Sequence, residues 1–293
     1  MRCPRYHLDL ALALLLAFLW GCTASRTGTS QPAGEAPRPD PGMPDQVRRG
    51  AIVYGPVSLS RFRLDSRDSI AMEMPDGSFQ RTVTVKTSFL TLNLRSRGES
   101  FSADIALDSM LLDRPNPILQ PLVDSARGTR WQGILQKTGR LDSMTPNKSS
   151  VFGEQVRAML QRLLPIVPDS GAEPGERWQE RTSMPYQIMA GFAATEDRTA
   201  DFRAEKWENE SGRRVLRIES SMNYTVSGSG SGFGQEIRFE GTGVAQGIHR
   251  LTTAGWLSSA EISDSVRMTL TVPAIGQSVP TVVVTTYSMK TLP

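Results

Sequence analysis

The sequence predicts a mainly β protein (β-rich α+β), with a curved antiparallel sheet or open half-barrel and one central amphipathic helix. Three observations predict this fold class. Apolar and polar residues alternate over most of the chain after residue 46, Gly- and Pro-containing turns separate the alternating runs, and one segment near residue 150 changes to helical spacing. One-sided alternation is typical of an antiparallel sheet with one buried and one hydrated face.

The alternating runs follow one another along the whole folded part. They include the sets Leu90, Leu92 and Leu94; Phe101, Ala103, Ile105 and Leu107; Leu216, Ile218, Met222 and Tyr224; Val266, Met268, Leu270 and Val272; and the β-branched run 281–287. The apolar positions change phase between Val83-Val85 and the run that begins at Leu90. We therefore expect a β-bulge or a sharp bend near Phe89.

The segment 150–164 is predicted to form the helix. Its apolar stripe recurs at a spacing of three or four residues, at Phe152, Val156, Met159, Leu160 and Leu163. Ser149 or Ser150 can cap its start, and Pro165 ends it. A single amphipathic helix among many strands is expected to cover the concave face of the curved sheet.

The N-terminus has the features of an export signal. Arg2 and Arg5 precede a largely apolar run, Leu8 to Trp20, which is short for a membrane span. The run ends in Leu19-Trp20-Gly21-Cys22, which resembles the lipobox of bacterial lipoproteins. The resemblance implies cleavage of the signal peptide before Cys22 and lipid attachment (a diacylglyceryl group and a further acyl chain such as palmitate) at this residue. An ordinary secretory signal with an incidental cysteine is the alternative.

Three segments follow from this N-terminus. Residues 1–21 are the expected lipoprotein signal peptide, and residues 22–46 are the lipidated cysteine with a tether too rich in Pro, Gly, Ser and Thr to form a core. Residues 47–293 are expected to form a single β-rich domain. A short sequence similarity between residues 128–132 and 175–179 leaves open a second arrangement, two related β halves around the helix at 150–164.

The sequence lacks the residues of the common catalytic and metal sites. After cleavage, Cys22 is the only cysteine and His249 the only histidine, so we expect no metal site, no cofactor and no enzyme activity. Carboxylate pairs such as Glu196 with Asp197, and Asp65 with Asp68, are expected in solvated turns. The formal net charge of +3 is scattered along the chain, which argues against nucleic acid as a partner.

Two further resemblances bear on function. The segments 164–168 and 174–178, Leu-Pro-Ile-Val-Pro and Pro-Gly-Glu-Arg-Trp, resemble an uncharacterised family of secreted bacterial β proteins. The combination of lipid anchor, tether, curved sheet and inner helix is similar to the periplasmic lipoprotein carriers of the LolA, LolB and LppX type. That similarity implies a lipid or other apolar ligand between sheet and helix, close to Phe101, Trp131, Met159, Leu163 and Trp178.

The same five side chains can instead fill an ordinary core. We therefore expect a lipoprotein of the cell envelope that is attached to a membrane through Cys22, with lipid binding as its activity. Thr23 follows the cysteine in place of Asp, which in proteins of this kind implies the outer membrane, facing the periplasm. The alternative is a structural or assembly component of the envelope that contacts another envelope protein and has no small-molecule ligand.

Overall fold

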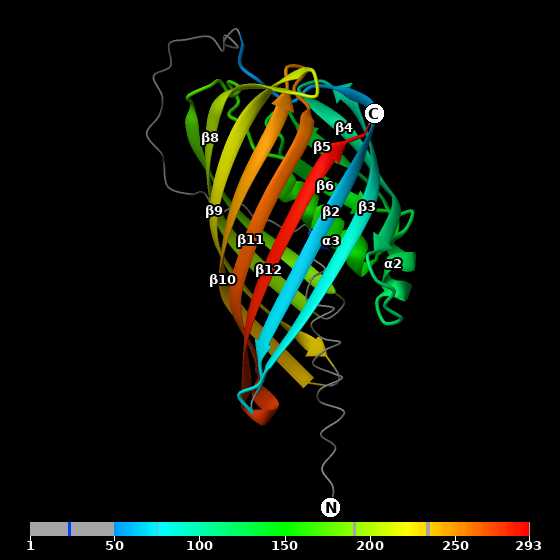
Figure 1. Cartoon of the computed structure of the whole chain (residues 1–293), viewed down its shortest axis with the longest axis vertical. Helices are drawn as coiled ribbons and strands as arrows, with labels where there is room; N and C mark the ends of the chain where they lie inside the picture. The colour runs from blue at the N-terminus through cyan, green and yellow to red at the C-terminus, as the bar shows by residue number, and fades with distance from the viewer. Residues whose placement is uncertain (1–22, 25–49, 75, 190–191, 233–234, 293) are drawn as a thin grey trace, which may run out of the picture.

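The computed structural model describes residues 23–24, 50–74, 76–189, 192–232 and 235–292, and it confirms the predicted fold class. Twelve strands form one antiparallel sheet (Figure 1). The strands are β1 (Thr23–Ala24), β2 (Val57–Glu73), β3 (Phe79–Arg97), β4 (Ser100–Leu112), β5 (Arg130–Gln136), β6 (Leu141–Pro146), β7 (Arg177–Met189), β8 (Phe192–Glu210), β9 (Arg213–Gly232), β10 (Gln235–Thr252), β11 (Leu257–Val272) and β12 (Gln277–Thr291).

The sheet is an up-and-down meander that joins the two ends of the folded part. Its strand order is β1-β7-β8-β9-β10-β11-β12-β2-β3-β4-β5-β6. The last strand, β12, pairs with β2 over eleven residue positions. Among the described residues, the two edges of the sheet, β6 on one side and β1 with β7 on the other, do not pair with each other, so the curved sheet stays open.

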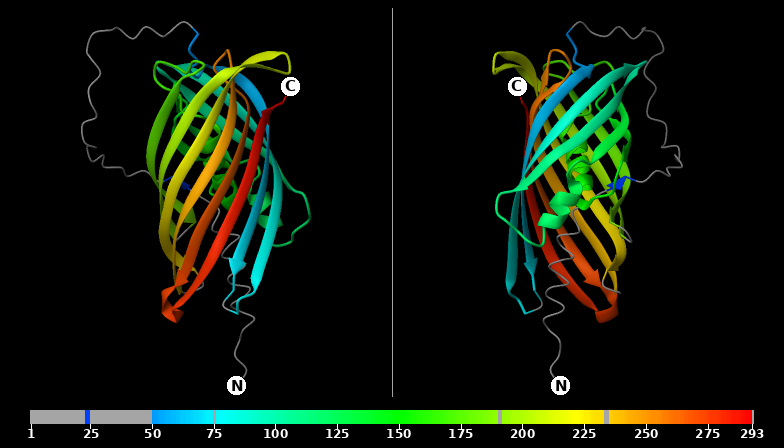
Figure 2. Two further views of the ribbon diagram at one scale, coloured as in Figure 1. Left: turned by 60° about the vertical axis from the view of Figure 1, so that its left-hand side comes forward. Right: turned by 90° about the vertical axis from the view of Figure 1, so that its right-hand side faces the viewer.

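Helix α3 (Val151–Leu163) connects β6 to β7 and lies on the inner, concave side of the sheet (Figure 2). The Ser150 Oγ caps its start by accepting a hydrogen bond from the Gly153 N–H at 3.2 Å, as the sequence predicts. The residues of the predicted apolar stripe are all buried in the core. Glu154 and Arg157, on the opposite side of the helix, are also buried, where they form an ion pair at 2.7 Å.

Two short helices were not predicted. Helix α2 (Gln120–Ala126) adds Val123 and Ala126 to the core, and the 3-10 turn η1 (Pro273–Ile275) joins β11 to β12. Each is too short to show a helical period in the sequence. No helix that the structure describes is long and apolar enough to cross a membrane.

The predicted irregularity near Phe89 exists, but its expected cause was wrong. The register between β3 and β4 shifts between Phe89 and Leu90, and the extra residue, Asp108, belongs to β4. Strand β3 itself keeps one phase, so Val83 points outward and is 45% exposed while Lys86 points inward and is buried. The apolar pattern changes phase because the inner face becomes polar at this level.

The predicted signal peptide 1–21, Cys22 and residues 25–46 of the predicted tether lie outside the described residues. Thr23 and Ala24, expected in the tether, form β1 and pair with Gln187 and Tyr186 of β7. The folded part thus includes the start of the segment that follows Cys22.

Candidate functional site

The inner face of the sheet carries two separate apolar clusters. The larger, which we call the proximal cluster, includes the apolar stripe of α3 together with residues of α2 and of most strands. The smaller, the distal cluster, consists of Met72, Ala194, Val226, Ile237, Phe239, Leu270 and Val279, which come from six strands. Its partly buried neighbours are Ile70, Met74, Val266, Met268 and Val272, so no residue of a described helix belongs to it.

Strand pairing places the distal cluster at the end of the sheet farther from α3. Ala194 pairs with Gly228, which pairs with Phe239; Phe239 pairs with Leu270, and Leu270 with Val279. This row lies close to the turns that end β9, β11 and β2. Strands β10 to β12 extend beyond α2 and α3 at this end (Figure 2).

A layer of inward polar side chains separates the two clusters. We call it the polar belt; it consists of Asp68, Lys86, Gln155, Arg162, Glu196, Arg198, Tyr224, Asp264 and Tyr287. Two of its members, Gln155 and Arg162, come from α3, and the others come from strands. Buried charges are costly unless they are paired, so the contacts within the belt decide what it can bind.

Arg162 is the centre of the first group in the belt. Its guanidinium donates to Glu196 Oε2 at 2.7 Å and also pairs with Asp264. Tyr287 Oη lies 3.5 Å from the same guanidinium. Burial raises the pKa of Tyr287 to about 12, with the Arg162 charge opposing the rise, so this hydroxyl stays protonated. The group joins α3 to β8, β11 and β12.

Tyr224 reaches this group across a glycine. Its hydroxyl donates to Asp264 Oδ1 at 2.6 Å, although β10 lies between their strands. The residue of β10 paired with Tyr224 is Gly243, and a Cβ atom built there would lie 2.1 Å from Tyr224 Cζ. The missing side chain of Gly243 is therefore what allows the ring to lie over β10. Burial also raises the pKa of Tyr224, so the hydroxyl remains a donor.

Three buried atoms of the belt lack a hydrogen-bond partner among the described residues: Asp68 Oδ1, Arg198 Nη1 and Glu196 Oε1. The Arg198 and Glu196 atoms lie 3.9 Å apart on β8, and their residues are 7% and 5% exposed. Burial lowers the pKa of Arg198, while the charge of Glu196 opposes this shift. A buried donor and a buried acceptor that are both unsatisfied are unusual in a folded protein.

The second polar group lies on the other side of the inner face. Lys86 Nζ donates to Asp68 Oδ2 at 2.7 Å and to Gln155 Oε1 at 3.0 Å. The same ammonium lies 4.8 Å from the ring centroid of Phe152. This group connects α3 to β2 and β3, so polar contacts hold the helix to the sheet on both sides.

His249 is fully buried on the proximal side of the belt. Its Nδ1 lies 2.9 Å from the Leu163 carbonyl oxygen, and its Nε2 lies 2.9 Å from Ser220 Oγ. The carbonyl can only accept, so Nδ1 carries the proton and Nε2 accepts from the serine hydroxyl.

The structure places the five predicted ligand-contacting residues in or beside the proximal cluster. Phe101, Trp131, Met159 and Leu163 are buried members of it. Trp178 packs against the cluster, stacks on Phe202 with ring centroids 5.5 Å apart, and donates from Nε1 to the Ile166 carbonyl at 2.6 Å. Four of the five thus belong to the proximal cluster and the fifth packs against it, and the distal cluster contains none of them.

The expectation of turns was wrong for all four carboxylates, which lie in β2 and β8, and the expectation of solvent exposure was wrong for two of them. Glu196 and Asp68 lie in strands, point inward and are buried in the polar belt. The inward direction of these two carboxylates is hard to recognise in the sequence, because their immediate neighbours along the strand are outward polar residues. The available signal was an oppositely charged pair in one phase of a strand, Glu196 with Arg198.

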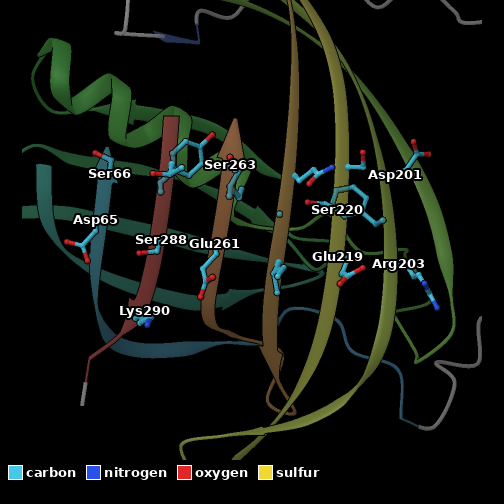
Figure 3. A pocket seen from close by; sticks show the side chains of 18 of the residues that line it. Asp65, Ser66, Asp201, Arg203, Glu219, Ser220, Glu261, Ser263, Ser288 and Lys290 are labelled. Carbon is cyan, nitrogen blue, oxygen red and sulfur yellow. The ribbon is translucent and has the colours of Figure 1, made fainter. Parts of the chain in front are cut away.

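The outer face of the sheet has a broad open depression of about 1290 Å³ (Figure 3). Charged side chains of both signs line it, among them Asp65, Asp201, Arg203, Glu219, Glu261 and Lys290. Strand pairing places several of them in one row across the sheet, since Asp65 pairs with Ser288, Ser288 with Glu261, and Arg203 with Glu219. Within the described residues, no group of three or more His, Cys, Asp or Glu side chains is arranged to hold a metal.

No family model and no curated protein matches the chain. Similar solved structures include a mutant Rh. blastica porin, with 6% identity, a TM-score of 0.25 and coverage of 80% of this chain and 100% of that chain. Another, titled "Asymmetric conductivity of engineered proteins", has 7% identity, the same TM-score and coverage of 80% and 99%. These TM-scores are too low to support an argument about fold or function.

Proposed function

We propose that this chain is a membrane-anchored lipoprotein of the cell envelope, facing the periplasm from the outer membrane, and that it binds an acyl chain or another apolar ligand. The distal cluster is the observation that carries the proposal. Apolar side chains from six strands converge there on a concave surface, and neither α2 nor α3 contributes to it. This position is farther from α3 than the sequence predicted.

The shape and composition of this inner face suit a long apolar molecule. Phe239 and Leu270 supply broad apolar side chains in one row across the sheet. Met72 and its partly buried neighbour Met268 supply flexible side chains that adapt to irregular apolar surfaces. Apolar walls with a few polar groups at one end are typical of small-molecule sites.

The position of β1 supports the link between anchor and ligand site. Ala24 pairs with Tyr186, Tyr186 with Ala194, and Ala194 begins the row that contains Phe239 and Leu270. Cys22, the predicted lipid attachment site, is two residues before Ala24. The segment that follows the proposed attachment site thus pairs with the sheet in the row of Ala194 and also contacts α3.

Two tryptophan substitutions in β9 test ligand binding. Val226 points inward in the distal cluster, and its neighbour Thr225 points outward and is exposed. We expect Val226→Trp to abolish or strongly reduce binding of the apolar dye N-phenyl-1-naphthylamine, because the ring occupies the ligand's space. Thr225→Trp, the matched control, should bind the dye as the unmodified protein does.

The outcome separates a ligand site from a filled core. If the inner face were filled by the protein itself, the dye would not bind the unmodified protein. That result would contradict the proposal. The anchor is tested separately: Cys22→Ser should release the protein from membranes and remove fatty-acid labelling.

The outer depression favours a second candidate function, that of an assembly component of the envelope. Its balanced set of charges could make complementary contacts with an envelope protein. Charge reversal at Glu261 should then abolish cross-linking to such a partner without affecting dye binding, whereas charge reversal should leave a pure ligand-binding protein unaffected.

A further inference from the structure

We infer that Arg198 and Glu196 bind the polar head of the ligand, and that this head is compact, uncharged and able both to donate and to accept a hydrogen bond, as a hydroxyl or an amide is. This inference rests on the proposed function and specifies the ligand class. It starts from the two buried atoms without partners, Arg198 Nη1 and Glu196 Oε1.

Both residues lie at the border between the polar belt and the distal cluster. They are two positions apart on β8, so their side chains share the inner face. Glu196 pairs with Val226, a member of the distal cluster, and Arg198 pairs with Tyr224 of the belt. A chain lying on the distal cluster would therefore have one end beside these two atoms.

The separation of the two atoms fits a bridging group. At 3.9 Å they are too far apart to hydrogen-bond each other. Nη1 can only donate, and an ionised carboxylate oxygen can only accept. A hydroxyl or a primary amide satisfies both atoms at once, since it accepts from Arg198 and donates to Glu196. An ester oxygen satisfies only the arginine.

The net charge of the side chains around Arg198 argues against an ionised head group on the ligand. Two arginines, Arg162 and Arg198, face two carboxylates, Glu196 and Asp264, so the group is already neutral. A carboxylate or phosphate on the ligand would add a buried charge without a counter-charge, next to two existing carboxylates. It would also leave Glu196 Oε1 without a donor.

The other half of the belt does not offer the same chemistry. Asp68 Oδ1 lacks a partner, but the nearby Lys86 ammonium already donates to Asp68 Oδ2 and Gln155. Only an unsatisfied acceptor is present there among the described side chains. The paired donor and acceptor on β8 therefore distinguish this side of the belt as the head-group site.

Competition with four ligands of equal chain length tests the inference. Tetradecanol and tetradecanamide both donate and accept, methyl tetradecanoate only accepts, and tetradecanoate is charged. In displacement of N-phenyl-1-naphthylamine from the full protein, we expect the alcohol and the amide to compete at concentrations about tenfold lower than the ester and the carboxylate.

Variants on the two faces of β8 locate the preference. Arg198→Met should remove the preference for the alcohol and the amide over the ester, measured as a ratio of competing concentrations within the one variant, while Glu196 keeps its ion pair with Arg162. Arg203→Met, the control, removes an arginine that points outward from the same strand and is half exposed, and should keep the preference. Arg198→Lys retains a hydrogen-bond donor and should keep part of the preference for the alcohol and the amide.

The outcomes separate this inference from the proposed function. If the dye does not bind the unmodified protein, the proposed function fails. If the dye binds but the four ligands compete equally, or the carboxylate competes best, the head-group inference fails while ligand binding stands. A void of about 10 Å³ beside Arg198 has room for about one water; a complex in which water alone bridges Nη1 and Oε1 would also overturn the inference.

Discussion

The buried His249 should make the stability of this protein depend on pH. Burial lowers its pKa to about 4, with the hydrogen bond to the Leu163 carbonyl opposing the shift, whereas an unfolded histidine titrates near 6.5. Between these values the unfolded chain binds a proton that the folded chain does not. Stability is therefore lost as the pH falls from about 6.5 to about 4. The loss is roughly 3 kcal/mol, because each tenfold difference in proton affinity between the folded and unfolded chains corresponds to about 1.4 kcal/mol.

Urea unfolding of the unmodified protein and of His249→Asn, at several pH values, measures this contribution. The asparagine can still donate to Leu163 but does not titrate, and the carboxylates affect both proteins alike. The stability advantage of the unmodified protein over the variant should shrink by about 3 kcal/mol between about pH 7.5 and pH 4. Stability curves that stay parallel over this range would refute the argument that His249 is buried and neutral.

Two further substitutions test the local geometry. Gly243→Val should destabilise the fold by about 2 kcal/mol or more, because the new Cβ displaces the Tyr224 ring from its hydrogen bond to Asp264; thermal unfolding measures this, and the outward Thr242→Val should have little effect. Ser150→Ala should cost about 1 kcal/mol through loss of the α3 cap; an equal loss in Ser149→Ala would contradict the assignment of Ser150 as the cap.

The sequence predicts most of the architecture because apolar and polar residues alternate along the strands. Leu90, Leu92 and Leu94 face inward as expected, and α3 begins and ends at the predicted residues within one position. What could not be predicted is the pairing order. The contact of β12 with β2, which brings the last strand beside the first long one, depends on residues more than two hundred positions apart, and no local pattern encodes it.

The candidate site was much less predictable than the fold. The interior was expected to be uniformly apolar, so inward polar residues such as Lys86 and Glu196 were interpreted as a phase change or as solvated turns. Their burial depends on partners far away in the sequence: Lys86 pairs with Asp68 and Gln155, and Glu196 with Arg162. A charged side chain on the inner face is plausible only once its counter-charge is known, and the sequence alone does not show which residues meet.

The polar belt explains why the inner face has two parts. An entirely apolar interior would avoid the desolvation cost of burying Arg162, Glu196 and Asp264, so these groups are not required for stability as such. They do fix the position of α3, because Arg162 and Gln155 find their partners at only one level of the sheet. A helix held at that level covers the proximal cluster and cannot slide over the distal cluster. The buried charges therefore fix α3 on the proximal side of the belt, and the distal cluster is made by strands alone.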